Sequence, residues 1–275
     1  MITVVIILML IGLLSSILGS LVGIGGGVIV VPALMYFGLS LGLLPAITPQ
    51  TAVGTSSMLL IFTGLSAMWS YAKNNQVDRQ NGTLFLIGLI PGAFTGSYAS
   101  SLFTVDSFNL YFGVFLIFVS ILLVVRNKIK PLKIFQNPKY MKPHRDNMGN
   151  VYHYGFPPYL AIAITFLVGF VTGLFGIGGG VLMTPLMLMV FRMPPTIAIG
   201  TSMMMVFFSG LSSASGHILQ GNVVFMYILL LVPAAILGAN IGVKINQKFN
   251  SNSLVIILRS VLFLLGIYLI SQTFF

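Results

Sequence analysis

The composition of the chain excludes a soluble globular protein. Of its 275 residues, 57% are hydrophobic and only 6% are charged, whereas a soluble domain carries about 25% charged residues. The 13 Lys and Arg residues stand against three Asp and no Glu, which gives a net charge of +10. In a membrane protein this excess indicates cytoplasmic loops rather than a nucleic-acid partner. The absence of cysteine excludes disulfides, thiolate metal sites and cysteine nucleophiles.

Apolar segments follow one another along the whole chain, and most approach the roughly 20 residues that a spanning helix needs. The first contains no Lys or Arg, so we expect it to be retained and not removed as a signal peptide. Segment 178–191 is short for a full span. We expect it to form a broken or re-entrant hairpin with its predecessor, with 26–47 as its counterpart in the first half. The segments are 2–22, 26–47, 51–71, 83–103, 106–126, 157–176, 178–191, 196–217, 223–243 and 252–273.

A basic linker divides these segments into two groups of five. Placing it in the cytoplasm brings Lys73, Arg79, Arg192, Lys244 and Lys248 to the same side and leaves both termini outside, in agreement with the positive-inside bias. We therefore predict a first membrane repeat (1–125), a cytoplasmic linker (126–156) and a second membrane repeat (157–275). A regulatory or lipid-binding role of the linker is the alternative to a plain solvated loop. Its cations are Arg126, Lys128, Lys130, Lys133, Lys139, Lys142 and Arg145.

The two halves share short motifs in the same order. Residues 21–32 (LVGIGGGVIVVP) resemble residues 174–185 (LFGIGGGVLMTP), and AVGTS at 52–56 resembles AIGTS at 198–202. Because each half has an odd number of segments, the second half enters the membrane from the opposite side. The predicted fold is all-α and integral to the membrane, with two inverted repeats of about five segments each and broken or re-entrant helices at the glycine motifs. Inverted repeats are common in secondary transporters, whose substrates bind near the bilayer midplane.

The two glycine motifs are the first candidate for chemistry. A helix broken there exposes amide N–H groups at the start of the next helix, and these donors together with the helix dipole favour an anion. Inside hydrocarbon such groups must find a partner or line a cavity. The alternative is that the glycines only allow close helix packing. The candidate substrate-binding residues of these motifs are Gly23, Gly25, Gly26, Gly27, Gly176, Gly178, Gly179 and Gly180.

Hydroxyl groups of the second motif are the next candidates: Thr55 and Ser56 in the first half, Thr201 and Ser202 in the second. Neutral hydroxyls suit a site that must bind an anion and release it again. The alternative is hydrogen bonding between helices, which is common in membrane bundles.

Arg259 is the one cation well inside a predicted span, and an intramembrane charge is a functional hypothesis by default. It is a candidate for attracting the anion, although Arg can also snorkel to the interface. The repeat alignment pairs it with Gly113, so symmetry does not support it. His217 aligns with Tyr71 near the outer end of its span, which leaves a proton-linked role and a plain interfacial position open.

Signatures of enzymes are missing from the chain. It contains no His-Glu-x-x-His motif, no glutamate and no Walker lysine. We therefore expect neither catalytic residues nor a bound metal or cofactor, and a protein that is not an enzyme.

The paired Gly-Ile-Gly-Gly-Gly-Val-x-x-x-Pro motifs, each followed by Ala-Val/Ile-Gly-Thr-Ser, resemble the TauE/SafE sulfite exporter family, also called the toluene sulfonate uptake permeases. The resemblance extends from about residue 8 to residue 270. It implies a multi-pass protein of the bacterial plasma membrane that carries sulfur-containing anions such as sulfite or sulfonates.

The sequence thus predicts a secondary carrier that moves a small sulfur-containing anion by alternating access, with the glycine motifs, the Thr/Ser pairs and Arg259 as its site. An anion channel and a membrane scaffold without transport are the alternatives. Single-channel conductance would favour the channel, whereas saturable flux and counterflow would favour the carrier. The expected partners are the anion and the lipid bilayer, with a homo-oligomer left open and no nucleic acid.

Overall fold

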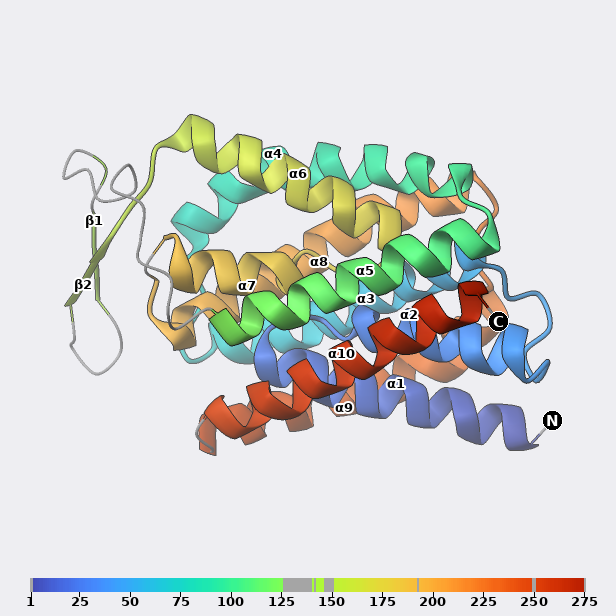
Figure 1. Ribbon diagram of the computed structural model, residues 1–275. Helices are drawn as coiled ribbons and strands as arrows, with labels where there is room; N and C mark the ends of the chain where they lie inside the picture. Colours follow the sequence, from blue (N-terminus) through green and yellow to red (C-terminus); the bar gives the residue numbers. More distant parts are fainter. Residues whose placement is uncertain are drawn as a thin grey trace.

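The computed structural model describes residues 2–125, 140, 142–145, 151–191, 193–248 and 251–274, and these residues form an elongated helical bundle (Figure 1). A π-helical turn η1 (Tyr36–Ser40) continues α2, and a 3-10 turn η2 (Ser100–Leu102) ends α4. The α-helices are α1 (Ile2–Val22), α2 (Gly27–Met35), α3 (Pro49–Ala72), α4 (Arg79–Ala99), α5 (Val105–Val125), α6 (Pro158–Phe175), α7 (Gly180–Met189), α8 (Pro195–Leu219), α9 (Phe225–Lys248) and α10 (Ser251–Phe274).

The prediction of a helical integral membrane protein is confirmed. Within the described residues, seven helices are long and apolar enough to cross a membrane: α1, α3, α4, α5, α6, α8 and α9. Gly27–Ser40, Gly180–Met189 and Arg259–Thr273 form shorter apolar helices. Large apolar side chains such as Leu14, Tyr111 and Leu237 are exposed on the outer helices, as expected where lipid is the solvent.

The second predicted segment, 26–47, is shorter in the structure. Helical structure ends with η1 at Ser40, and an irregular stretch leads to α3. Gly42 and Ala46 in this stretch have positive φ angles of 64° and 70°, which a continuing right-handed helix cannot accommodate. Thr48 then caps α3, because its hydroxyl oxygen accepts a hydrogen bond from the Thr51 amide. This segment is therefore too short for a full span, like its proposed counterpart 178–191, which is helical over Gly180–Met189.

The linker contains regular structure that the sequence did not predict. Strands β1 (Lys142–Arg145) and β2 (Val151–Tyr154) form an antiparallel hairpin in which Lys142 lies opposite Tyr154. The hairpin lies at one end of the bundle, and both chain termini lie at the other end (Figure 1). The linker cations at positions 126, 128, 130, 133 and 139, and Arg192, lie outside the described residues.

Helices α3 and α8 cross at the centre of the bundle and are its most buried spans. The Ser57 and Ser213 hydroxyls form a hydrogen bond of 2.9 Å between them. Around this pair, α1 packs against α9, α4 packs against α6, and α5 packs against α10. Glycines allow these helices to approach closely, since a Cβ at Gly92 on α4 would meet the Phe166 carbonyl of α6.

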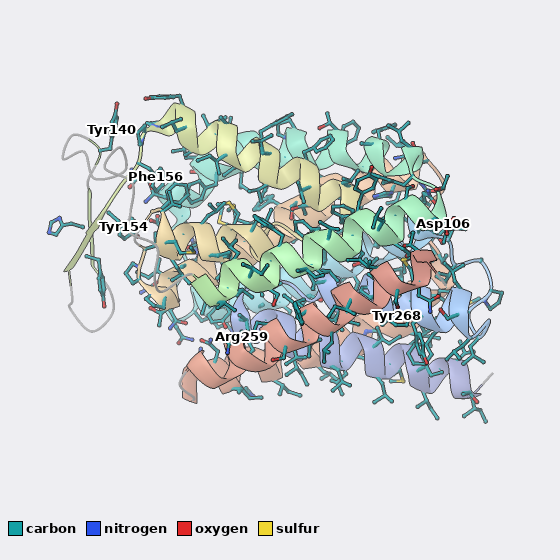
Figure 2. All side chains as sticks on the ribbon, viewed as in Figure 1. Asp106, Tyr140, Tyr154, Phe156, Arg259 and Tyr268 are labelled. Carbon is teal, nitrogen blue, oxygen red and sulfur yellow. The ribbon has the colours of Figure 1, made fainter. Side chains whose placement is uncertain are left out.

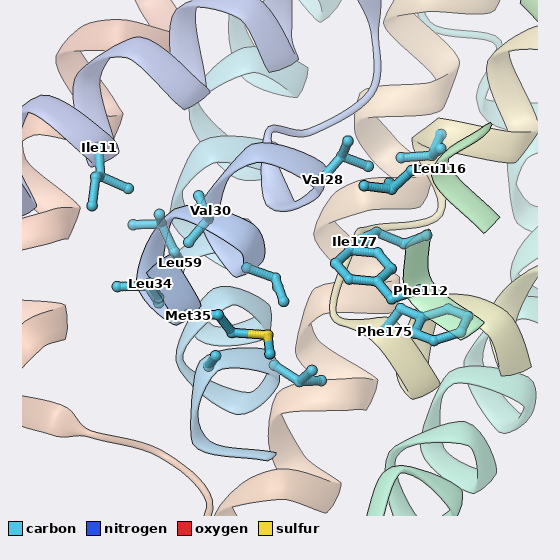
Figure 3. Close-up of a cluster of buried hydrophobic side chains, with 14 of the residues drawn as sticks. Ile11, Val28, Val30, Leu34, Met35, Leu59, Phe112, Leu116, Phe175 and Ile177 are labelled. Atoms are coloured by element: carbon cyan, nitrogen blue, oxygen red, sulfur yellow. The ribbon is translucent and has the colours of Figure 1, made fainter. Parts of the chain in front are cut away.

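One hydrophobic cluster joins the two halves of the chain (Figure 3). Phe175, the last residue of α6, stacks on Phe112 of α5 with ring centroids 5.1 Å apart. Val28 of α2 and Ile177, which lies between α6 and α7, belong to the same buried cluster. Apolar packing of this kind holds the two glycine motifs in contact.

Candidate functional site

The first glycine motif interrupts a helix. After α1 ends at Val22, Gly23, Gly25 and Gly26 adopt φ angles of 82°, 92° and 89°, a region that only glycine enters at little cost. The amides of residues 24 and 25 both donate to the Gly19 carbonyl, at 2.7 and 3.1 Å, and so close the end of α1. Helix α2 then starts at Gly27.

The second glycine motif interrupts the helical structure between α6 and α7, and its φ angles differ in part from those of the first motif. Gly176 and Gly178 have φ angles of 65° and 76°. Gly179 is right-handed, with φ −56°, and its amide donates to the Ser209 hydroxyl at 2.9 Å. Helix α7 starts at Gly180. The interruption that both glycine runs predict is thus present.

The two motifs lie against each other in a reciprocal arrangement. A Cβ added to Gly27 would meet the carbonyl oxygen of Gly176, and a Cβ added to Gly180 would meet that of Gly23. The last glycine of each motif therefore touches the first glycine of the other. All eight glycines of the predicted site are buried in this region.

The predicted serines form hydrogen bonds across the contact between the two glycine motifs. Ser56 of α3 donates to the Gly176 carbonyl at 2.7 Å, and Ser202 of α8 donates to the Gly23 carbonyl at 2.8 Å. Each serine thus bonds to the glycine motif of the opposite half. Thr184 of α7 also donates to the Gly23 carbonyl, at 2.7 Å. Thr184 is not among the predicted site residues, although its hydroxyl in LFGIGGGVLMTP has no equivalent in the first motif.

The predicted threonines also reach into the opposite half. The Thr55 hydroxyl oxygen accepts from the amide of Val224, just before α9, at 3.1 Å. The Thr201 hydroxyl oxygen accepts from the amide of Asp78, just before α4, at 2.9 Å. Neither hydroxyl donates to another described residue, so each keeps a hydrogen available for a ligand.

Tyr71 and His217 occupy corresponding places as well. The Tyr71 hydroxyl donates to the Ser20 carbonyl at 2.8 Å, and His217 Nε2 donates to the Gly173 carbonyl at 3.3 Å. Both side chains are fully buried. The ring of His217 is enclosed by protein, and its interfacial position and proton-linked role both stay predictions.

Arg259 lies apart from these residues. It lines an open groove of about 480 Å³ between α5 and α10, with neighbours that include Ser120 and Phe263 but no residue of either glycine motif. The structure does not pair Gly113 with Arg259, as the repeat alignment does. A Cβ at Gly113 would lie 2.8 Å from the Gly266 carbonyl oxygen, and a Cβ at Gly266 would lie 2.8 Å from that of Gly113. Gly113 thus has Gly266 as its counterpart across the α5–α10 contact.

The unequal number of donors to the two glycine carbonyls gives a prediction. Ser56→Ala removes the one described donor to the Gly176 carbonyl, whereas after Ser202→Ala the Gly23 carbonyl keeps Thr184. A buried carbonyl without a partner costs about 1–3 kcal/mol. We expect Ser56→Ala to lower the thermal unfolding midpoint in detergent clearly more than Ser202→Ala. Adding Thr184→Val to Ser202→Ala should remove the difference, and equal midpoints for the two single variants would contradict the assignment.

A buried contact ties the linker hairpin to the bundle. The Tyr154 hydroxyl donates to Asp78 Oδ2 at 2.8 Å, and Asp78 also accepts from the amide and side chain of Asn81. Burial raises the pKa of Tyr154, and the Asp78 charge raises it further, so the hydroxyl stays a donor. Next to it, Phe156 stacks on Phe85 and packs against Phe191, with centroids 4.9 and 4.4 Å apart.

Tyr154→Phe is expected to loosen the linker. The substitution removes a hydrogen bond to a buried carboxylate, an interaction worth about 1.5–3 kcal/mol. Trypsin should then cleave the lysine-rich linker several times faster while the helices remain resistant. Tyr159→Phe, at a side chain that is 64% exposed, is the matched control. Identical cleavage rates for the wild type and Tyr154→Phe would show that the contact does not hold the hairpin.

Comparisons with known proteins agree with the motifs. The chain matches the family described as Sulfite exporter TauE/SafE over residues 8–269. It is 41% identical over 270 residues to the probable membrane transporter protein YunE of Bacillus subtilis, covering 98% of both chains. It is 28% identical over 277 residues to the probable membrane transporter protein MJ0441 of Methanocaldococcus jannaschii, covering 96% of this chain and 94% of that protein. No solved structure gives a significant match.

The family match covers nearly the whole chain, and the apolar helices are those of a multi-pass protein of the plasma membrane. Both observations agree with the descriptions of its relatives as probable membrane transporter proteins. The chain therefore belongs to the sulfite exporter TauE/SafE family of membrane transporters.

Proposed function

We propose that the protein is a secondary carrier that moves a small sulfur-containing anion, sulfite or a sulfonate, by alternating access. The observation that carries the proposal is the reciprocal contact of the two interrupted glycine motifs at the centre of the bundle. The family description supports sulfite or a related anion as cargo. The linker 126–156 is assigned to the cytoplasm and both termini to the outside, because the linker holds more than half of the cations.

Two inverted repeats explain why the contacts occur in pairs. The Ser56–Gly176 bond has its counterpart in Ser202–Gly23, and α1–α9 packing has its counterpart in α4–α6 packing. Paired contacts of this kind arise when two similar units are related by a two-fold axis. With five helices in each half, that axis lies in the membrane plane, which is the arrangement of many secondary transporters.

The chemistry at the contact favours an anion. Amides of Gly26, Gly27 and Gly178 form no hydrogen bond to another described residue, and unpaired buried amides are costly. They stand at or just before the N-termini of α2 and α7, where the helix dipoles favour negative charge. The unused hydroxyl hydrogens of Thr55 and Thr201 are further donors, one toward each end of the α3–α8 pair. Neutral donors can release an anion more readily than a fixed cation could.

The way in which the motifs meet supports a mechanism of alternating access. The glycine-to-carbonyl contacts enclose both motifs, so the described conformation is closed at the centre. Opening to either side requires one half to rotate against the other and separate these contacts. An inside-negative potential favours outward movement of an anion by about 2.3 kcal/mol per charge per 100 mV, so export needs no coupling ion.

Reconstituted flux tests the proposal. Proteoliposomes loaded with labelled sulfite should release it at a saturable rate, and unlabelled sulfite outside should accelerate exchange. A scaffold would give no flux above empty vesicles, and an anion channel would give conductance without counterflow. Absence of flux for sulfite and for a panel of sulfonates would contradict the proposal.

A further inference from the structure

A polar pocket lined by no residue of either glycine motif lies at the end of the bundle that carries both termini. It has a volume of about 140 Å³ and is formed by α2 with η1, by the start of α5 and by the end of α10. Figure 2 shows Asp106 and Tyr268, which line it, at the end opposite Arg259. Oxygen-bearing side chains dominate its polar lining: Ser40, Asp106, Asn109, Tyr268 and Gln272.

The charge of the pocket is negative. Asp106 contributes a carboxylate, and no Lys or Arg is among the described residues that line the pocket. Asp106 and Asn109 are three residues apart on α5, so their side chains share one face of that helix. An anion is disfavoured here, whereas a cation finds one full charge and several neutral oxygens.

Asn109 carries an unused ligand atom. Its side chain is only 7% exposed, and Oδ1 has no hydrogen-bond partner among the described residues. Buried polar atoms are rarely left unpaired, because each costs about 1–3 kcal/mol. An amide oxygen is a good ligand for a hard cation.

The walls of the pocket link three separate elements. The Ser40 and Tyr268 hydroxyls lie 3.1 Å apart and join η1 to α10. The Tyr268 ring also packs edge-on against Tyr36, with centroids 5.7 Å apart. π-helical turns such as η1 often occur at functional sites. Since η1 continues α2, which starts at the first glycine motif, an ion held here would fix the far end of that helix.

We propose that this pocket binds one monovalent cation, with Na⁺ as the probe. A single carboxylate balances a single positive charge, whereas Ca²⁺ sites usually gather several carboxylates. The volume of about 140 Å³ holds an ion together with a few waters of about 30 Å³ each. The site is separate from the proposed anion site and does not depend on which anion the protein carries.

Thermal unfolding of the purified full-length protein tests the site. Ligand that binds only the folded state raises the unfolding midpoint in a concentration-dependent way. At constant ionic strength, replacing choline chloride with NaCl should raise the wild-type midpoint by a few degrees and then saturate. Asp106→Asn should abolish the rise, and Asn109→Leu should weaken or abolish it while leaving the carboxylate in place. Asp146→Asn, the same chemical change in the linker, is the matched control and should keep the full rise.

Equilibrium binding of ²²Na⁺ provides the second readout. It measures the site directly, even in a variant whose unfolding midpoint already differs from that of the wild type in choline chloride. The wild type and Asp146→Asn should bind close to one Na⁺ per chain, and Asp106→Asn should bind none. Equal midpoints in NaCl and choline chloride, Na⁺ binding retained by Asp106→Asn, or stabilisation by CaCl₂ alone would overturn the proposal. These measurements contain no sulfite or sulfonate, so their failure is distinct from a failure of the proposed transport.

Discussion

Gly27→Ala is expected to reduce sulfite flux at least about tenfold. The added Cβ would meet the Gly176 carbonyl oxygen and backbone atoms of Ile177, and overpacking of this kind costs about 1–3 kcal/mol. Helix propensity alone predicts that Ala would stabilise α2, by about 1 kcal/mol relative to Gly. A loss of function would therefore report the contact between the halves. Initial rates in proteoliposomes, normalised to inserted protein, provide the measurement.

Gly179→Ala is the control at the other motif. Although Gly179 was among the predicted substrate-binding glycines, its amide is bonded to the Ser209 hydroxyl and so is not free for an anion. Gly179 has a right-handed φ of −56°, and its Cβ would meet only side-chain atoms, the nearest being Leu89 Cδ1 at 3.2 Å. The Leu89 side chain can shift, and the backbone amide is retained. We expect flux within about twofold of the wild type, since the change is near the small end of core substitutions. Normal flux in Gly27→Ala would mean that the close approach of the motifs is not needed for transport.

The double variant Thr55→Val/Thr201→Val is expected to lower the transport rate at subsaturating anion by about tenfold or more. Valine keeps the shape of threonine but removes the hydroxyl that accepts from Val224 or Asp78 and that could donate to the anion. Hydrogen bonds to charged groups contribute about 1.5–3 kcal/mol each. The two hydroxyls lie toward opposite ends of the α3–α8 pair, so a small anion meets one of them at a time. The reciprocal positions predict similar losses of about tenfold or more for the two single variants.

Thr95→Val controls for the loss of a threonine hydroxyl in itself. Thr95 is exposed on α4, and its hydroxyl donates to the Pro91 and Gly92 carbonyls of its own helix. Its flux should match the wild type. An unchanged rate at subsaturating anion in the double variant, with normal insertion, would remove both threonines from the site.

The central features of the fold were predictable because they rest on backbone chemistry. Left-handed φ angles end an α-helix, and glycine adopts them at little cost. The interruptions at residues 23–26 and 176–179 therefore follow from the two glycine runs. The AVGTS and AIGTS repeats placed hydroxyls after both runs in the same order. The structure brings those hydroxyls to the opposite motif, a pairing that the repeat pattern alone did not specify.

Other features depend on contacts between distant segments and left no clear pattern. The Tyr154–Asp78 bond joins a linker strand to α4 across 76 positions. The contact that pairs Gly113 with Gly266, in place of Arg259, lies at different depths along the two helices, because Gly113 is about eight residues after the start of α5 and Gly266 about fifteen residues after the start of α10. Arg259 was singled out because a charge inside a span is rare, but its groove lies on the α5–α10 surface. Its role in attracting an anion stays a prediction.

Substrate protection of single cysteines tests the central claim most directly, and the natural chain contains no cysteine to interfere. Thr55→Cys, Thr201→Cys and the control Thr95→Cys would each be reacted with a small charged thiosulfonate reagent, with and without a sulfonate that the proteoliposome assay shows to be carried. The account predicts that the sulfonate slows labelling at residues 55 and 201 to similar extents and leaves residue 95 unaffected. Labelling at 55 and 201 that proceeds at the same rate with and without saturating substrate would contradict an anion site between the two glycine motifs.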